Sequence, residues 1–307
     1  MTATATISSS KRLNPWRFFA LAIGLSWLFW IPLALLGEEP MKFPFVILMI
    51  LGGLGPAMAE IILIFGLGSR HQRRDYWHRV FDVRRISLGW CAVIFLMFPV
   101  LNAIATLLSG LTGGPWPAFE TATRLLTNPL SIVPYVIFMF LFGPLPEELG
   151  WSGYALDSLQ SRWSALTSSL IVGVAWAVWH LPLFFMEGTF QSEQIGLATP
   201  SFWWYILPTL PISVLDTWIY NNANRSTLSA ALLHFMVNLS GELFGLTQHA
   251  RLYQAGLIFI VTAVITAIWG PRTLTRRQKD TAPPASPRGA GSPTAAELNE
   301  GRPSTQS

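Results

Sequence analysis

Residues 88–112 read LGWCAVIFLMFPVLNAIATLLSGLT, a run of twenty-five residues without a charged side chain. A helix that crosses a bilayer needs about 20 mostly apolar residues, so this run predicts a membrane-spanning helix. Seven other runs of similar length and composition lie on either side of it. We therefore predict an all-α fold, a polytopic bundle of about eight transmembrane helices, at residues 16–37, 43–68, 88–112, 131–156, 164–186, 202–220, 227–245 and 252–269.

The composition is also typical of a membrane protein. Only 12% of the 307 residues are charged, whereas soluble domains carry about 25%. Fourteen Trp and twenty Phe suit a chain with two membrane–water interfaces. The net charge is +4, but the arginines cluster beside the apolar runs, so we expect membrane lipids and no nucleic acid as partners. The single Cys91 excludes an intrachain disulfide and a cysteine metal cluster.

Positive charge is distributed unevenly among the predicted loops. If the N-terminus is cytoplasmic, that side carries fourteen lysines and arginines up to Lys279, and the outer loops carry only Lys42, Arg124 and Arg251. The positive-inside rule thus predicts a multi-pass protein of the cell membrane with both termini cytoplasmic. We expect a cytoplasmic arm at 1–15, a membrane domain at 16–270, and a disordered cytoplasmic tail at 271–307, because the tail is rich in Pro, Ala, Ser, Thr and Gly.

Ionisable side chains are costly in hydrocarbon, about 2.5–3.5 kcal/mol each at a helix centre, and are therefore functional candidates. The first group is Glu147 and Glu148, in the run PLPEELGWS at 144–152. Pro146 suits the first turn of a helix, which places both carboxylates near its positive end. One of them could act as a general base on water. The alternative is a hydrated helix start at the membrane interface.

Two further groups follow along the chain. His180 lies deep in an apolar run, and Pro182 should loosen the helix there, because it cannot donate to the carbonyl of Val178. His234 and Asn238 are four residues apart and share a helix face. Taken singly, His180 could be a hydrogen-bonded packing residue, and the His234–Asn238 pair could join two helices. Three weaker candidates are Glu60, Asp216, which we place near the cytoplasmic surface, and Glu242.

These motifs, in this order on successive apolar runs, resemble those of the CPBP family. That family comprises the type II (Rce1-like) CAAX prenyl endopeptidases and bacterial relatives linked to bacteriocin immunity. The similar core covers about residues 131–246, and TWIYNN at 217–222 and Gly55-Pro56 are similar too. The motif residues that match are Glu147-Glu148, Trp176-x-x-x-His180 and His234-x-x-x-Asn238. One position departs, since Ser152 stands where the family has an arginine.

The resemblance implies hydrolysis of peptide bonds in membrane-associated substrates, including prenylated CAAX-type peptides. Glu147, helped by His180, would activate water, and His234 and Asn238 would hold the oxyanion. Glu148 would orient the site from behind. Without the family's arginine, we expect Glu148 either to be neutral or to borrow a cation, with Arg162 the nearest candidate downstream.

Several alternatives stay open. His180, His234 and Glu147 could instead hold a catalytic zinc, because relatives are described both as metalloproteases and as glutamate-dependent enzymes; we favour water activation without metal. The chain could also be a catalytically silent relative with a binding or immunity role, or a transporter. We expect a polar cavity that opens to the cytoplasm. Straight helices would leave Glu147 and His180 at different depths, so a helix break near Pro144 and Pro146, or a re-entrant start to the next span, is required.

Overall fold

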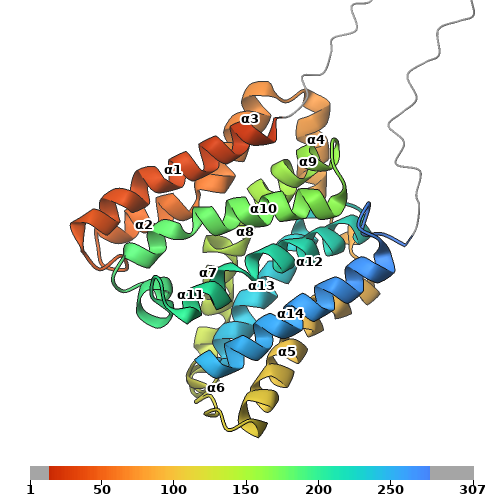
Figure 1. The fold of residues 1–307 in the computed structure, drawn as a ribbon. Helices are drawn as coiled ribbons and strands as arrows, with labels where there is room; N and C mark the ends of the chain where they lie inside the picture. The colour runs from red at the N-terminus through yellow and green to blue at the C-terminus, as the bar shows by residue number, and fades with distance from the viewer. Residues whose placement is uncertain (1–13, 277–307) are drawn as a thin grey trace, which may run out of the picture. The chain divides into compact units, whose positions relative to one another are not determined.

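The structure is a computed structural model that describes residues 14–276. Within this range every regular element is a helix, so the predicted all-α fold is confirmed (Figure 1). The α-helices are α1 (Pro15–Leu36), α2 (Phe45–Gly53), α3 (Gly55–Leu67), α4 (Arg70–Phe81), α5 (Leu88–Leu111), α6 (Glu120–Thr127), α7 (Ile132–Phe142), α8 (Pro144–Gly150), α9 (Asp157–Gln160), α10 (Ala165–Trp179), α11 (Pro200–Ile206), α12 (Thr209–Asn222), α13 (Thr227–Phe244) and α14 (Gln248–Trp269). Shorter 3₁₀ and π turns are η1 (Val83–Arg85), η2 (Pro129–Ser131), η3 (Trp151–Leu156), η4 (Leu181–Phe185) and η5 (Gln191–Ile195).

Five of the predicted spans are long, apolar helical segments. They are Pro15–Leu36, Leu88–Leu111, Pro129–Gln160, Ala165–Phe185 and Gln248–Trp269. A sixth span is formed if the bent pair α2 and α3, which meet at 52°, crosses as one unit. The chain is therefore a multi-pass membrane protein, with five or six such spans among the described residues.

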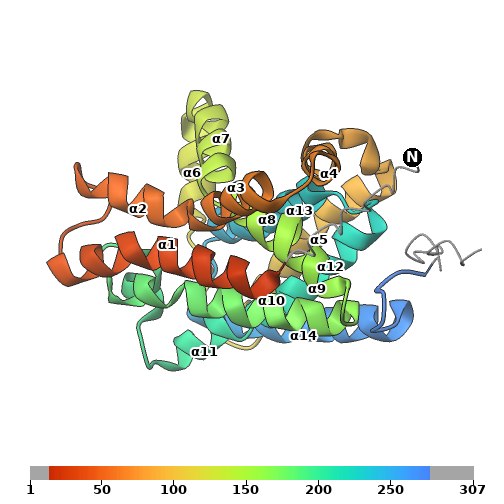
Figure 2. The same cartoon turned by 90° about the horizontal axis from the view of Figure 1, so that it is seen from above.

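The other two predicted spans are helical but less regular. The run at 202–220 is divided between α11 and the fourteen-residue α12. The run at 227–245 forms α13, an eighteen-residue helix that carries His234, Asn238 and Glu242. In two perpendicular views α8 and α13 lie near the centre of the bundle, and α13 packs against α5, α8 and α12 (Figures 1 and 2). A total of eight spans stays a prediction.

Basic side chains gather at one end of the bundle. This arginine-rich end consists of the start of α1, residues 68–87, 161–164, 223–226 and 270–276, which hydrogen bonds tie together, as between Arg85 and Asn224 and between Ala165 and Arg272. It holds eleven of the fourteen lysines and arginines in residues 14–276: Arg17, Arg70, Arg73, Arg74, Arg79, Arg84, Arg85, Arg162, Arg225, Arg272 and Arg276. The opposite end consists of residues 37–44, 112–131, 186–200 and 245–251, and it holds Lys42, Arg124 and Arg251. The predicted charge asymmetry is thus a property of the folded bundle.

Residues 271–276 pack against the bundle, although the membrane domain was expected to end at Gly270. The backbone carbonyls of Pro271 and Arg272 accept hydrogen bonds from the start of α10, and Leu274 is fully buried. Residues 271–276 therefore belong to the membrane domain, although their composition predicts a disordered tail. The rest of that predicted tail, 277–307, and most of the predicted arm at 1–15 lie outside the described residues.

Candidate active site

A helix break places the two glutamates. α7 ends at Phe142, and Gly143 adopts φ −126° and ψ −103°, so α8 starts again at Pro144. Glu147 lies in the first turn of α8, and Glu148 follows it; both are buried. The predicted break near Pro144 is confirmed, and the alternative of a hydrated pair at the membrane interface does not match this burial.

Trp176 connects the first glutamate to the first histidine. Its indole Nε1 donates to Oε2 of Glu147 at 2.7 Å, and its backbone oxygen lies 2.9 Å from Nδ1 of His180. Because a carbonyl oxygen only accepts, Nδ1 must carry the hydrogen, which leaves Nε2 of the neutral ring with a free lone pair. α10 ends at Trp179, and His180 caps it ahead of the 3₁₀ turn that contains Pro182. The predicted loosening of the helix at the histidine is therefore confirmed.

The depths of Glu147 and His180 also agree. Measured from the arginine-rich end, Glu147 is thirteen residues from the end of its segment at Gln160, and His180 is fifteen residues from Ala165. At about 1.5 Å per residue the two positions differ by only about 3 Å along the bundle. The disagreement that the sequence suggested came from span boundaries placed a few residues off, together with the assumption of straight helices.

Glu148 contacts the second histidine. Its Oε1 lies 3.0 Å from Nδ1 of His234, and its Oε2 accepts a hydrogen bond from the hydroxyl of Ser152. The basic side chain that contacts Glu148 is thus His234, and not Arg162, which is exposed at the arginine-rich end. Ser152 fills the position of the family's arginine with a short donor of its own.

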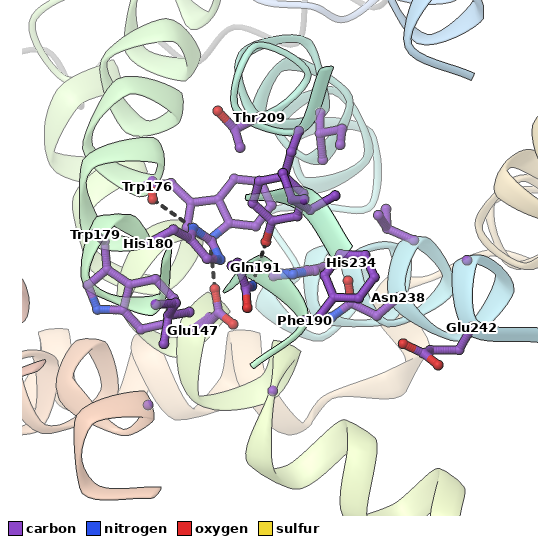
Figure 3. A pocket seen from close by; sticks show the side chains of 18 of the residues that line it. Glu147, Trp176, Trp179, His180, Phe190, Gln191, Thr209, His234, Asn238 and Glu242 are labelled. Carbon is purple, nitrogen blue, oxygen red and sulfur yellow. Dashed lines mark hydrogen bonds between the residues drawn. The ribbon is translucent and has the colours of Figure 1, made fainter. Parts of the chain in front are cut away.

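The reactive groups line a cavity of about 460 Å³ (Figure 3). Glu147, His180, His234 and Asn238 all border it, and Glu148 does not. In Figure 3 Glu147 and His180 lie toward one side of the cavity, and Asn238 and Glu242 toward the other. The predicted site residues therefore converge, with Glu148 behind His234.

The cavity does not reach the arginine-rich end. Its wall includes the exposed Met41, Glu242 and Gln248, and none of the residues at 68–87, 161–164, 223–226 or 270–276. It therefore extends from the buried Glu147 toward the opposite end of the bundle. The two expectations, that the arginine-rich end is cytoplasmic and that the cavity opens to the cytoplasm, are incompatible in this structure.

The weaker candidates take different places. Glu242 lines the cavity, whereas Glu60 is fully buried in α3 and does not. Asp216 is buried in α12 and not near the surface as we expected. With Glu148 and Ser152 it borders a separate void of about 10 Å³, a size that accommodates about one water molecule.

The described residues do not form a metal-ligand set. No three His, Cys, Asp or Glu side chains in residues 14–276 come together as ligands. Glu147 faces the indole of Trp176, and Nδ1 of His234 is occupied by Glu148. Because this arrangement does not fit a three-ligand zinc site, we derive no step through a metal.

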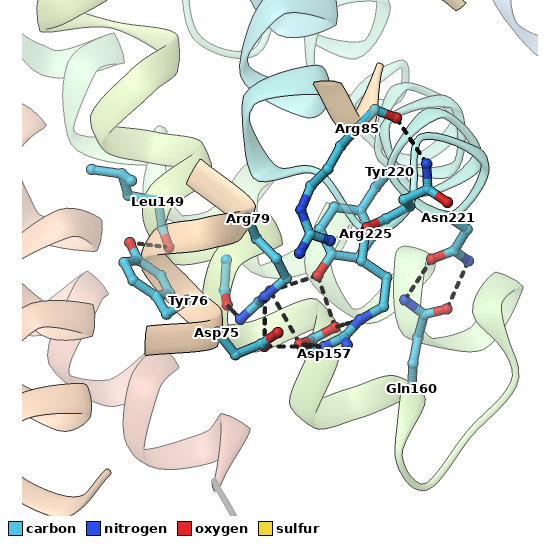
Figure 4. Close-up of polar contacts among 12 residues, drawn as sticks. Asp75, Tyr76, Arg79, Arg85, Leu149, Asp157, Gln160, Tyr220, Asn221 and Arg225 are labelled. Atoms are coloured by element: carbon cyan, nitrogen blue, oxygen red, sulfur yellow. Dashed lines mark hydrogen bonds and ion pairs between the residues drawn. The ribbon is translucent and has the colours of Figure 1, made fainter. Parts of the chain in front are cut away.

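A clasp of polar contacts made by Tyr76 and Arg79 holds α8 and η3 from the arginine-rich end (Figure 4). The hydroxyl of Tyr76 donates to the carbonyl of Leu149 at 3.3 Å, and Arg79 donates to the carbonyl of Gly153 at 3.2 Å. Arg79 is almost fully buried and also pairs with Asp157 at 3.1 Å. The two carbonyls that the clasp holds, those of Leu149 and Gly153, lie before and after Ser152, which belongs to the π-helical turn η3 that follows α8. Such π turns are frequent at functional sites.

Comparison with known proteins agrees with this geometry. Residues 129–240 match the family model of the Rce1-like type II CAAX prenyl endopeptidases. The chain is also 31% identical, over 261 residues, to CAAX prenyl protease 2 of Methanococcus maripaludis, an alignment that covers 84% of this chain and 94% of that protein. The chain belongs to the Rce1-like family. The matched range contains every residue that the sequence placed at the site, and a family of proteases supports a protease here.

Two features of this Rce1-like site were not evident from sequence. The tryptophan of the aromatic-x-x-x-His motif was recognised, but not its hydrogen bond to Glu147. Tyr205 was missed; its ring lies 5.9 Å from that of His180, and it lines the cavity. Only the run of aromatic residues around it, FWWY at 202–205, could have indicated it.

Proposed function

We propose that this protein is an intramembrane endopeptidase in which Glu147 activates the attacking water. One observation carries the proposal. At the wall of the cavity, Glu147 bonds to the indole of Trp176 and His180 bonds to the backbone oxygen of the same residue. Glu147 takes the proton of a water molecule as its oxygen attacks the peptide carbonyl carbon. The same proton then passes to the departing amine.

His180 and His234 have different parts in this scheme. Nε2 of neutral His180 accepts a hydrogen bond from the water and orients it. In this scheme His234 carries a hydrogen on both ring nitrogens: Nδ1 donates to Glu148, and Nε2, together with the amide of Asn238, donates to the oxyanion at the cavity. Donors fixed in advance at a developing negative charge commonly contribute the largest single term in acyl transfer.

The substrate we propose is a membrane-associated peptide. Apolar side chains that are themselves exposed on the helix bundle border the cavity: Phe138 (55% exposed), Phe142 (47%) and Trp204 (42%). Such a wall lets a lipid-linked chain approach from within the bilayer. The name of the Methanococcus relative, a CAAX prenyl protease, supports a prenyl group as that lipid.

We also propose the orientation that the arginines favour, with both termini and the arginine-rich end in the cytoplasm. The mouth of the cavity then faces the outer side, and substrates enter from there or from the bilayer. This replaces our expectation of a cytoplasmic opening.

Cleavage of defined peptides tests the proposed activity. Purified protein in lipid nanodiscs should cleave an S-farnesylated peptide ending in Cys-Val-Ile-Ala, and cleave it faster than the same peptide without the farnesyl group. Activity that persists through chelation supports metal-free catalysis. Zinc bound stoichiometrically, with activity lost to chelator and restored by zinc, would contradict it. If no member of a panel of membrane peptides is cleaved, the protease assignment fails.

A further inference from the structure

Arg251 is a cation placed in the wall of the reaction cavity. It lies in the first turn of α14, half-buried, and borders the same cavity as Glu147 and His180. Its guanidinium lies over the ring of Phe190, 4.9 Å from the centroid. The ring covers one face of the guanidinium and leaves its edge donors free, since a cation–π contact uses the face.

No carboxylate of residues 14–276 pairs with this cation. The buried Arg79 and the half-buried Arg225 both reach Asp157, but Arg251 has no acidic oxygen within 4.0 Å in the part of the chain described. Glu242, which is exposed, borders the same cavity, and it forms no ion pair with Arg251. A guanidinium placed against apolar surface without a counter-ion favours binding of an anion from outside.

Its surroundings favour a small, planar anion at the end of a chain. Arg251 occupies the N-terminal turn of α14, where the helix dipole adds positive potential, and the exposed Gln248 stands one turn before it. A guanidinium binds a carboxylate through two parallel hydrogen bonds. A cavity of about 460 Å³ has the size of a small-ligand site, about 300–1,000 Å³, so it holds only a few residues of a peptide.

We propose that Arg251 binds the free C-terminal carboxylate of the substrate, and so positions the scissile bond a few residues before the chain end. The inference rests on the proposed endopeptidase function and deepens it, since it assigns one residue of this chain to the recognition of the substrate's chain end. Arg251 is then a specificity-determining residue, distinct from the groups that act on water.

The test compares one peptide with two chain ends. The farnesylated peptide above is made with a free C-terminal carboxylate and with a carboxamide, and kcat/KM is measured for the wild type and for Arg251→Gln. In the wild type the carboxamide should be cleaved at least about 10-fold less efficiently, the usual value of a charge-assisted hydrogen bond. Arg251→Gln should lower cleavage of the acid to the level of the amide and leave the amide unchanged.

A matched control is Arg124→Gln. Arg124 lies at the same end of the bundle and over an aromatic ring, Tyr135, but outside the cavity; its variant should still distinguish acid from amide. Equal cleavage of acid and amide by the wild type overturns the proposal, as does a preference for the acid that survives Arg251→Gln. If inorganic phosphate or anionic lipid binds at Arg251 while the wild type binds peptide acid and amide equally, the site is one for phosphate or lipid headgroups and the proposal is also wrong.

Binding separates this proposal from the protease assignment. Glu147→Gln protein should bind the acid more tightly than the amide, by about the same factor, in a titration that needs no turnover. If the protein binds the acid more tightly than the amide but the wild type cleaves neither, the protease assignment is wrong and the carboxylate site stands. If the wild type cleaves acid and amide equally well, the protease assignment stands and the carboxylate site is wrong.

Discussion

The indole nitrogen of Trp176 lies 2.7 Å from Oε2 of Glu147, and the backbone oxygen of the same tryptophan lies 2.9 Å from Nδ1 of His180. One residue thereby sets both the orientation of the proposed base and the tautomer of the histidine beside it. The side-chain bond can be removed by substitution, whereas the backbone bond survives, so the two roles can be separated.

Trp176→Phe should lower kcat by about 10-fold or more and change KM little. The phenyl ring keeps most of the packing but cannot donate to Glu147, and hydrogen bonds to charged groups contribute about 1.5–3 kcal/mol. Steady-state cleavage of the farnesylated peptide measures both constants. Trp27 is not part of the cavity wall, and its indole donates to the carbonyl of Trp179; Trp27→Phe is the control and should stay near wild type. A loss confined to KM would mean that Trp176 only shapes the substrate pocket.

Ser152→Ala should lower kcat by about 10-fold, because it deprives Glu148 of one of its two donors and loosens the hold on His234. Ser152→Arg, which restores the arginine of the family, should retain activity with an altered pH profile. Cleavage rates measured between pH 5 and 9 test both variants. Ser161→Ala, which removes an exposed hydroxyl bonded to a backbone carbonyl, is the matched control. Should Ser152→Ala match the wild type at every pH, the serine does not stand in for the arginine.

The orientation can be tested by labelling in intact cells. In a Cys91→Ser background, a cysteine at Glu120, on the exposed face of α6, should react with a thiol reagent that cannot cross membranes. A cysteine at His71, exposed in α4 at the arginine-rich end, should react only after permeabilisation. The reversed pattern would put the cavity on the cytoplasmic side and refute the arginine-based assignment.

Arg79→Ala should destabilise the protein by about 1.5–3 kcal/mol, because it removes a buried donor to Asp157 and to the carbonyl of Gly153, whereas Asp157 keeps its contact with Arg225. Arg84→Ala, at an exposed ion pair with Asp82, should cost about 0–1 kcal/mol. Thermal unfolding in detergent compares the two variants. Equal melting temperatures would show that the clasp on η3 contributes nothing to stability.

Long apolar runs predicted the helical class and most spans, and the ionisable residues within them were marked as functional candidates because such residues are costly in hydrocarbon. The resemblance to the CPBP motifs predicted that Glu147, His180, His234 and Asn238 share one site. Sequence patterns could not predict that Glu148 pairs with His234 rather than with a distant arginine, since that contact joins α8 to α13. The sequence patterns also gave the wrong end of the bundle for the opening of the cavity. That opening depends on how α2, α11 and α14 pack around the mouth of the cavity. The depth of Asp216 was wrong for a similar reason. The sequence of a short helix such as α12 does not show where that helix lies along the axis of the bundle.

The central claim is that Glu147 is the base, and the rate of peptide cleavage by Glu147→Gln tests it most directly. The amide keeps the shape of the side chain and cannot take a proton from water, so kcat should fall by about 10² to 10⁴, with the melting temperature unchanged. Glu60→Gln, which alters a buried carboxylate away from the cavity, should cleave at nearly the wild-type rate. If Glu147→Gln instead cleaves as fast as the wild type, Glu147 is not the base and the proposed mechanism is wrong.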